Sequence, residues 1–102
     1  MKSGYIYRAK IVNICNPSSF SLLIDLGFDH SVIKKVELFR VKPVEIDNNA
    51  ENFLNNLLIN KEVLIKSRKS GNKYIVEISA EISGSKVNLS SYLLSLGYVE
   101  KI

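Results

Sequence analysis

The spacing of apolar residues changes twice along this chain, and this change restricts the fold more than any other feature. Up to residue 46 apolar and polar residues alternate loosely, between 47 and 60 the apolar residues recur at helical intervals, and from 62 to 79 they alternate again. Alternation is typical of half-buried strands, whereas the longer spacing is typical of one face of a helix. The sequence therefore predicts a sheet that is interrupted by a helix.

Three strands are predicted before this helix. They cover residues 4–15, 20–26 and 31–46. The run Asn16-Pro17-Ser18-Ser19 favours a turn between the first two strands, because each of these residue types stabilises turn conformations. We expect an antiparallel meander in which 31–46 is the long central strand, ending near Pro43 because proline has no N–H for a ladder.

The segment 47–60 carries one apolar stripe. Its members are Ala50, Phe53, Leu54, Leu57 and Leu58. Asp47, Asn48 or Asn49 is expected to cap the N-terminus of the helix, and Asn60 is expected to take the left-handed conformation at its end. We expect Leu57 to lie centrally in the buried face.

A hairpin and a second helix are predicted to follow. Residues 62–69 and 73–79 alternate around Ser70-Gly71-Asn72, a turn signal, while Asn88 suits a helix N-cap and Gly97 a C-cap. The apolar residues of this helix are Leu89, Tyr92, Leu93 and Leu96. The order of elements predicts an α+β fold, a five-stranded OB-type Greek-key barrel with a helix between strands 3 and 4 and a C-terminal helix.

Length and composition predict one domain over residues 1–102. No apolar run is long enough to span a membrane and the N-terminus lacks the apolar region of a signal peptide, so we expect a cytoplasmic location. The single cysteine, Cys15, is expected to be a buried, unreactive thiol because it ends a strand-like run. The aromatic residues expected in the core are Phe20, Phe28, Phe53 and Tyr92.

The net charge of +4 is concentrated in residues 61–73. This segment contains Lys61, Lys66, Arg68, Lys69 and Lys73 against a single acidic residue, Glu62. A basic patch favours a phosphate-rich partner through counterion release. Lysines at a sheet edge also prevent aggregation, and the sequence does not distinguish these two uses.

Particular residues within this order of elements resemble the staphylococcal-nuclease-like (micrococcal thermonuclease) family. The family's opening strand, turn, strand and Pro-Glu segment is similar to YRAKIVNICNPSSFSLLIDLGFDHSVIKKVELFRVKPVE. Its helix and hairpin are similar to AENFLNNLLINKEVLIKSRKSGNKYIVEI, and its closing helix to VNLSSYLLSLGYVEKI. The resemblance covers nearly the whole chain and implies a nuclease-like OB fold.

The same resemblance implies that the nuclease chemistry has been lost. In the family two aspartates hold calcium, a glutamate activates water, and two arginines bind the phosphate. Matched position by position, the acidic turn is replaced by Asn16, Ser18 and Ser19. Glu37 stands at the first arginine and Val76 at the second, and Lys42 stands at the metal-binding aspartate of the Ile-Asp segment. Only Glu45 agrees with the family. A lysine ammonium repels calcium and cannot bind it. We expect no enzyme activity, no metal and no cofactor.

A new set of metal ligands would have to come from Asp25, Asp29, His30 and Glu45. Asp25 is expected in mid-strand, and Asp29 and His30 in a turn at the far end, so these side chains are not expected to converge. His30 is expected to face solvent because no carboxylate is spaced to orient it. Lys42 is expected either to replace calcium as the positive centre beside Glu37 and Glu45, or to contact phosphate.

Our main hypothesis is a catalytically inactive nuclease-fold module that binds single-stranded nucleic acid or DNA. The residues expected to contact phosphate are Lys34, Lys35, Arg40, Lys42, Lys66, Arg68, Lys69 and Lys73, with Tyr74 or Phe39 stacking on bases. The alternative is a protein-interaction or assembly module without a nucleic-acid role, as in degenerate nuclease folds that resemble extended Tudor domains. A third hypothesis is a small-ligand pocket at the old nucleotide site. Few aromatic residues remain for stacking, which slightly favours a weak phosphate-driven or a protein partner.

Overall fold

The computed structural model describes residues 5–68 and 74–102, and eight strands and two helices lie in these ranges. The strands are β1 (Ile6–Asn16), β2 (Ser19–Gly27), β3 (His30–Leu38), β4 (Val41–Pro43), β5 (Glu62–Ser67), β6 (Ile75–Ile82), β7 (Ser85–Asn88) and β8 (Val99–Lys101). The helices are α1 (Asn48–Leu58) and α2 (Leu89–Leu96). Lys69, Lys73 and the turn predicted at Ser70-Gly71-Asn72 lie outside the described residues.

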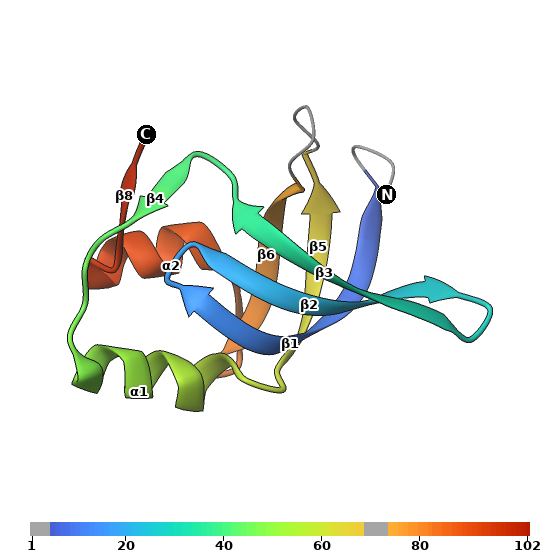
Figure 1. Cartoon of the computed structure of the whole chain (residues 1–102), viewed down its shortest axis with the longest axis horizontal. Helices are drawn as coiled ribbons and strands as arrows, with labels where there is room; N and C mark the ends of the chain where they lie inside the picture. The colour runs from blue at the N-terminus through green and yellow to red at the C-terminus, as the bar shows by residue number, and fades with distance from the viewer. Residues whose placement is uncertain (1–4, 69–73) are drawn as a thin grey trace.

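Five of the strands form a barrel organised around β1. This strand pairs antiparallel with β2 on one side and with β5 on the other, in the sheet order β3-β2-β1-β5-β6-β7. A parallel pairing of β3 with β6 closes the barrel, and β7 extends the sheet beyond β6. Helix α1 connects the third and fourth barrel strands, and α2 packs against β6, β7 and β8 (Figure 1). The predicted OB-type barrel with two helices is confirmed.

The closure between β3 and β6 is short. It consists of the pairs Glu37 with Ile75 and Leu38 with Val76, whereas β3 pairs with β2 along its whole length. Figure 1 shows the β2–β3 hairpin projecting beyond the other strands, away from the helices. Among the described residues, the β6-facing edge of β3 therefore has no neighbouring strand before Glu37.

The prediction of one central strand over residues 31–46 is wrong. Strand β3 ends at Leu38, and Arg40 turns the chain in the left-handed conformation with φ 61°. The next residues form β4, which pairs with β8 in a separate two-stranded sheet. Leu38 and Val41 are both buried although they lie three positions apart, so the alternation changes phase at this turn. The prediction of one continuous strand overlooked this change of phase.

The core combines alternate residues of the barrel strands with one face of each helix. Its fully buried side chains include Ile11, Phe20, Leu22, Ile24, Val36, Leu54, Leu58, Ile65, Val76, Ile78, Leu89 and Leu93. Each such side chain contributes about 1.5–3 kcal/mol when it is removed from water. Leu57, expected to lie centrally in the buried face of its helix, lies at the margin of the core and is only partly buried.

The predicted helix ends are confirmed. The Asp47 side chain accepts a hydrogen bond of 2.8 Å from the backbone N–H of Ala50, and Asn60 has φ 64° after the helix. The Asn88 side chain accepts a hydrogen bond of 3.2 Å from the N–H of Ser91. Gly97 ends α2 with φ 79°, which glycine adopts without steric cost.

Several side chains expected in the core lie outside it. Phe28 forms the tip of the β2–β3 hairpin with 97% of its surface exposed, because the two-residue turn points it into solvent. Phe53 is 43% exposed on α1 and contacts Tyr98 edge to face, and Tyr92 is partly buried. Cys15 is exposed, since register shifts in β1 after Ile11 and Ile14 break the alternation. In residues 5–68 and 74–102, neither helix has the length and apolar character needed to cross a membrane.

Candidate functional site

Five side chains make two separate ring contacts where β3 meets β6, and we call them the seam cluster: Lys34 with Tyr74, and Arg40 and Arg68 with Phe39. Backbone hydrogen bonds bring their three segments together. The N–H of Glu37 donates to the carbonyl of Tyr74 at 2.9 Å, that of Phe39 to Val76 at 3.0 Å, and that of Arg68 to Ile75 at 2.6 Å. The cluster is therefore held by the same bonds that close the barrel.

Both aromatic rings of the seam cluster are in contact with cations of the chain itself. The Lys34 ammonium lies 5.2 Å from the centroid of the Tyr74 ring. The guanidinium carbons of Arg40 and Arg68 lie 4.8 Å and 5.4 Å from the centroid of the Phe39 ring. These distances are within the range of favourable cation–π contacts.

The seam cluster carries excess positive charge. Arg68 Nε donates a hydrogen bond to Glu77 Oε2 at 2.8 Å, so one of the three cations is neutralised. Lys34 and Arg40 have no carboxylate within ion-pair distance among residues 5–68 and 74–102. Two positive charges thus remain available to an anionic ligand, Lys34 beside the partly buried Tyr74 and Arg40 beside the partly buried Phe39.

Among the described residues, three other cations predicted to contact phosphate make none of these ring contacts: Lys35, Lys42 and Lys66. Lys35 faces the side of β3 opposite Lys34, and Lys66 on β5 lies across from Glu77 in the ladder register. Lys42 on β4 lies 3.5 Å from Glu100 on β8. The sequence pointed neither to Glu77 nor to Glu100 as a partner, because strand register and the β4–β8 pairing determine both neighbours.

The positions matched to the nuclease site are not arranged for cation binding. Asn16 Oδ1 accepts hydrogen bonds from the backbone N–H of Ser18 at 2.9 Å and from its hydroxyl at 3.1 Å, and Ser18 and Ser19 are buried. Val76 is fully buried in the barrel. In the part of the chain that the structure describes, no three His, Cys, Asp or Glu side chains lie together as a metal site. The expected pairing of Lys42 with Glu37 or Glu45 is replaced by its contact with Glu100.

Of the remaining ligand candidates, three lie near the tip of the β2–β3 hairpin and Glu45 lies elsewhere. Asp25 Oδ1 accepts a hydrogen bond of 2.8 Å from the N–H of Gly27 near the hairpin tip, where Asp29 and His30 are exposed. Glu45 instead lines a groove of about 470 Å³ formed by the β1–β2 turn, residues 43–46 and α1. The solvent-facing position predicted for His30 is confirmed.

The groove beside Glu45 lies at the position that the family resemblance matches to the nuclease catalytic site. Asn16 and Pro17 line it together with Cys15, Glu51 and the apolar side chain of Leu54. Its two carboxylates and the absence of a basic residue among its described lining residues oppose the binding of a phosphate. The hypothesis of a nucleotide-like ligand at this position therefore has no electrostatic support.

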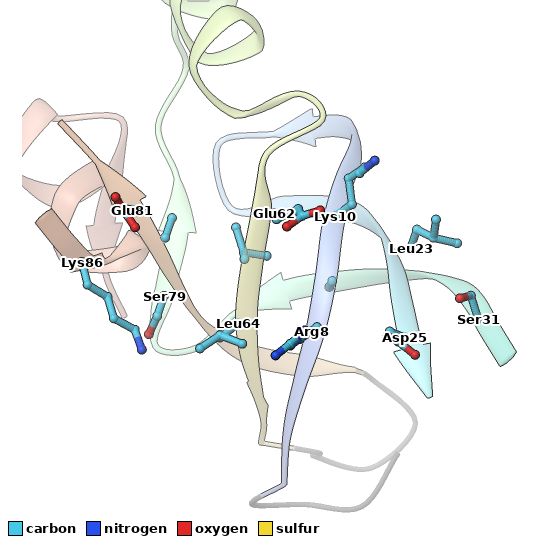
Figure 2. Close-up of a pocket in the computed structure, with 13 residues that line it drawn as sticks. Arg8, Lys10, Leu23, Asp25, Ser31, Glu62, Leu64, Ser79, Glu81 and Lys86 are labelled. Atoms are coloured by element: carbon cyan, nitrogen blue, oxygen red, sulfur yellow. The ribbon is translucent and has the colours of Figure 1, made fainter. Parts of the chain in front are cut away.

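A shallow cleft of about 500 Å³ lies on the outer face of the sheet (Figure 2). Its charged lining residues are Arg8, Lys10, Asp25, Glu62, Glu81 and Lys86. Lys10 lies across from Glu62 on neighbouring strands, and Glu81 across from Lys86. Because three positive and three negative groups line this cleft, it favours neither a cationic nor an anionic ligand. The seam cluster, in contrast, favours an anionic one.

Comparison with known proteins identifies a fold and no family. No family model matches the chain, and no curated protein matches it. The human TDRD1 extended Tudor domain, solved in complex with a symmetrically dimethylated peptide, superposes with a TM-score of 0.71 at 12% identity, covering 100% of this chain and 93% of that one. Extended Tudor domain TD3 of mouse TDRD1, in complex with a MILI peptide containing dimethylarginine 45, gives a TM-score of 0.71 at 8% identity, covering 100% and 96%. The chain therefore shares the nuclease-like fold of extended Tudor domains.

Proposed function

We propose that this domain is a protein-interaction module that binds an acidic peptide segment at the seam cluster. Its fold likeness to two domains solved with bound peptides supports an interaction role over an enzymatic one. The observation that carries the proposal is the state of the seam cluster: its rings are in contact with the chain's own cations, and Lys34 and Arg40 have no carboxylate partner among the described residues.

This arrangement favours an anionic ligand. A nucleobase needs an accessible ring face on which to stack, and a dimethylarginine needs an aromatic surface free of other cations. At Phe39 and Tyr74, either ligand would have to displace Arg40, Arg68 or Lys34. A peptide carboxylate instead complements these charges directly and forms strong charge-assisted hydrogen bonds with an arginine.

The nucleic-acid hypothesis is weakened by the pairing of its own residues. Arg68 is bonded to Glu77, and Lys42 lies beside Glu100, so neither cation is free for phosphate without losing its partner. Within the seam cluster, Lys34 and Arg40 are the cations that have no ion pair among the described residues. A short run of carboxylates matches this charge better than the continuous phosphate backbone of a nucleic acid.

The proposal is tested by selecting ligands from a random peptide display library on the intact domain. We expect the selected peptides to be enriched in aspartate and glutamate. When each is titrated into isotope-labelled domain, the backbone signals of Lys34, Arg40 and Tyr74 are expected to shift. Homopolymeric single-stranded DNA and RNA are titrated in parallel at several salt concentrations.

Two matched variants locate the interaction. Lys34→Gln removes one free cation of the seam cluster, while Lys86→Gln removes an exposed cation on β7, outside the cluster. Lys34→Gln is expected to weaken peptide binding by roughly tenfold, within the range for loss of a charge-assisted contact, and Lys86→Gln to leave it unchanged. Failure to select any peptide, or tight single-stranded nucleic-acid binding that Lys34→Gln abolishes, would overturn the proposal.

A further inference from the structure

The open edge of β3 presents unpaired backbone groups next to the seam cluster. The N–H groups of Glu37 and Phe39 point toward β6, where they bond to the carbonyls of Tyr74 and Val76. Because backbone groups alternate along a strand, those of residues 31, 33 and 35 point to the same side. The pairing with β6 begins only at Glu37, so these three residues have no ladder partner on this side among the described residues.

This edge is accessible. Ser31, Ile33 and Lys35 are exposed, and the Ile33 side chain has 63% of its surface in solvent. A row of unpaired N–H and C=O groups on an exposed strand is a template for an added strand. Extended peptides use such edges in β-augmentation, where the backbone bonds give affinity and alternate side chains give specificity.

We propose that the acidic peptide binds as an added strand along β3 between Ser31 and Lys35, with two consecutive acidic residues beside Lys34 and Lys35. This inference rests on the proposed function and adds the binding mode and the sequence class of the ligand. In this mode the peptide ends directly before Glu37, where the pairing of β6 with the same edge of β3 begins.

The requirement for consecutive acidic residues follows from the two faces of β3. Lys34 pairs in register with the buried Leu22 and lies on the inner face, whereas Lys35 pairs with Ser21 on the outer face. Neighbouring residues of an added strand also point to opposite faces. One carboxylate on each face therefore requires two acidic residues in sequence, and the exposed Ile33 favours a β-branched apolar residue next to them.

The charges of this edge also argue against a second copy of the same chain. Pairing two β3 edges would bring Lys34 and Lys35 of one copy toward those of the other. Like charges across neighbouring strands are destabilising, whereas opposite charges are favourable. The edge thus resists self-association and accepts an acidic strand.

Amide hydrogen exchange on the isotope-labelled domain tests the binding mode. The probe is a synthetic peptide, Thr-Val-Thr-Glu-Glu-Val-Thr, and the control peptide carries lysine in place of both glutamates. On saturation with the probe, exchange at Ile33 and Lys35 is expected to slow by about tenfold or more, because their N–H groups gain partners. Exchange at Val32 and Lys34, which already pair with β2, is expected to change little.

Two substitutions at one position separate backbone from side chain. Ile33→Pro removes the edge N–H without removing a bond to β2, and Ile33→Ala keeps this N–H while it shortens the side chain. Binding of the probe is expected to be lost in Ile33→Pro and weakened only severalfold in Ile33→Ala. If circular dichroism shows that Ile33→Pro does not fold, the probe peptide is instead N-methylated on its backbone, at odd positions in one version and at even positions in another. We expect one version to lose binding and the other to keep it, because only alternate N–H groups of an added strand face β3.

The outcomes distinguish this inference from the proposed function. Exchange that slows elsewhere, or equal binding of Ile33→Pro and Ile33→Ala, overturns the added-strand mode and leaves a peptide-binding module. Protection of the β3 edge only at high protein concentration, together with dimers in sedimentation, overturns it in favour of a second copy. If neither the probe nor any library-selected peptide binds, both proposals are wrong.

Discussion

The ammonium group of Lys34 lies 5.2 Å from the centroid of the Tyr74 ring, at the place where β3 separates from β6. Lys34 occupies an inner-face position of β3, across from the fully buried Leu22. A lysine at such a position can cover apolar surface with its aliphatic stem while its charge stays near water. Lys34 and Tyr74 together cover the barrel interior beside the part of β3 that precedes Glu37, where no described strand pairs with β3 on this side.

This relationship predicts a measurable coupling between the two side chains. In a double-mutant cycle of Lys34→Met and Tyr74→Leu, we expect a coupling free energy of about 0.5–1 kcal/mol in denaturant unfolding. Lys35→Met serves as the control, since Lys35 points to the other face, and its coupling to Tyr74→Leu is expected to be near zero. Equal coupling for both lysines would show that the ring interacts with net charge rather than with one ammonium group.

The helices provide a second prediction, about burial. Leu93→Ala is expected to lower the free energy of unfolding by about 2–5 kcal/mol, because the side chain is fully buried and its loss leaves a cavity. Leu57→Ala is expected to cost about 1 kcal/mol, since Leu57 is only partly buried at the edge of α1. Urea unfolding at equilibrium measures both values. Similar losses for the two variants would place Leu57 in the core after all.

Features that depend on neighbouring residues could be predicted from this sequence. The caps at Asp47, Asn88 and Gly97 arise from side-chain bonds or backbone freedom within one turn, and the barrel follows from the order of strands and helices. Features that depend on register could not. Cys15 is exposed because β1 is irregular, and the segment 31–46 breaks at Arg40, where the buried positions change phase between Leu38 and Val41.

The candidate site was predictable in composition and not in geometry. The sequence identified Lys34, Arg40, Arg68 and Tyr74, but it grouped them with Lys42, which lies on the separate β4–β8 sheet, and with Lys66, which lies across from Glu77. Pairing across the β3–β6 seam decides which ring each cation contacts. The open edge of β3 had no sequence signal, because an unpaired strand has the same alternation as a paired one.

The hairpin tip provides a third prediction. Phe28 and Asp29 both have positive φ, 53° and 63°, in a two-residue turn between Gly27 and His30. This conformation favours Asn-Gly, and the left-handed region costs an ordinary residue about 1–2 kcal/mol. The double substitution Phe28→Asn with Asp29→Gly is therefore expected to raise the free energy of unfolding by about 1 kcal/mol in urea denaturation.

The control for the hairpin is Phe28→Ser alone. It removes the exposed ring and retains a residue that strongly disfavours left-handed backbone, so stability is expected to stay nearly constant. Because Phe28 is 97% exposed, its side chain contributes almost no burial to the folded state. A loss of stability in the Asn-Gly variant would mean that the ring packs on the hairpin in solution.

The last prediction concerns the position at which the family resemblance expects a metal ligand. Lys42 lies 3.5 Å from Glu100, with 57% and 58% of the two side chains exposed, so this ion pair is well solvated. Lys42→Ala is expected to cost no more than about 1 kcal/mol in urea unfolding, because exposed ion pairs contribute little. Added calcium or EDTA is expected to leave the melting temperature of the wild-type domain and of Lys42→Ala unchanged.

The matched control for this position is Lys101→Ala, which removes an exposed cation on the same small sheet with no ion pair among the described residues. If calcium stabilised Lys42→Ala and neither the wild type nor Lys101→Ala, the lysine would occupy a latent cation site beside Glu37 or Glu45. Glu45 lines the groove next to α1 and Lys42 contacts Glu100 on β8, which argues for the opposite result.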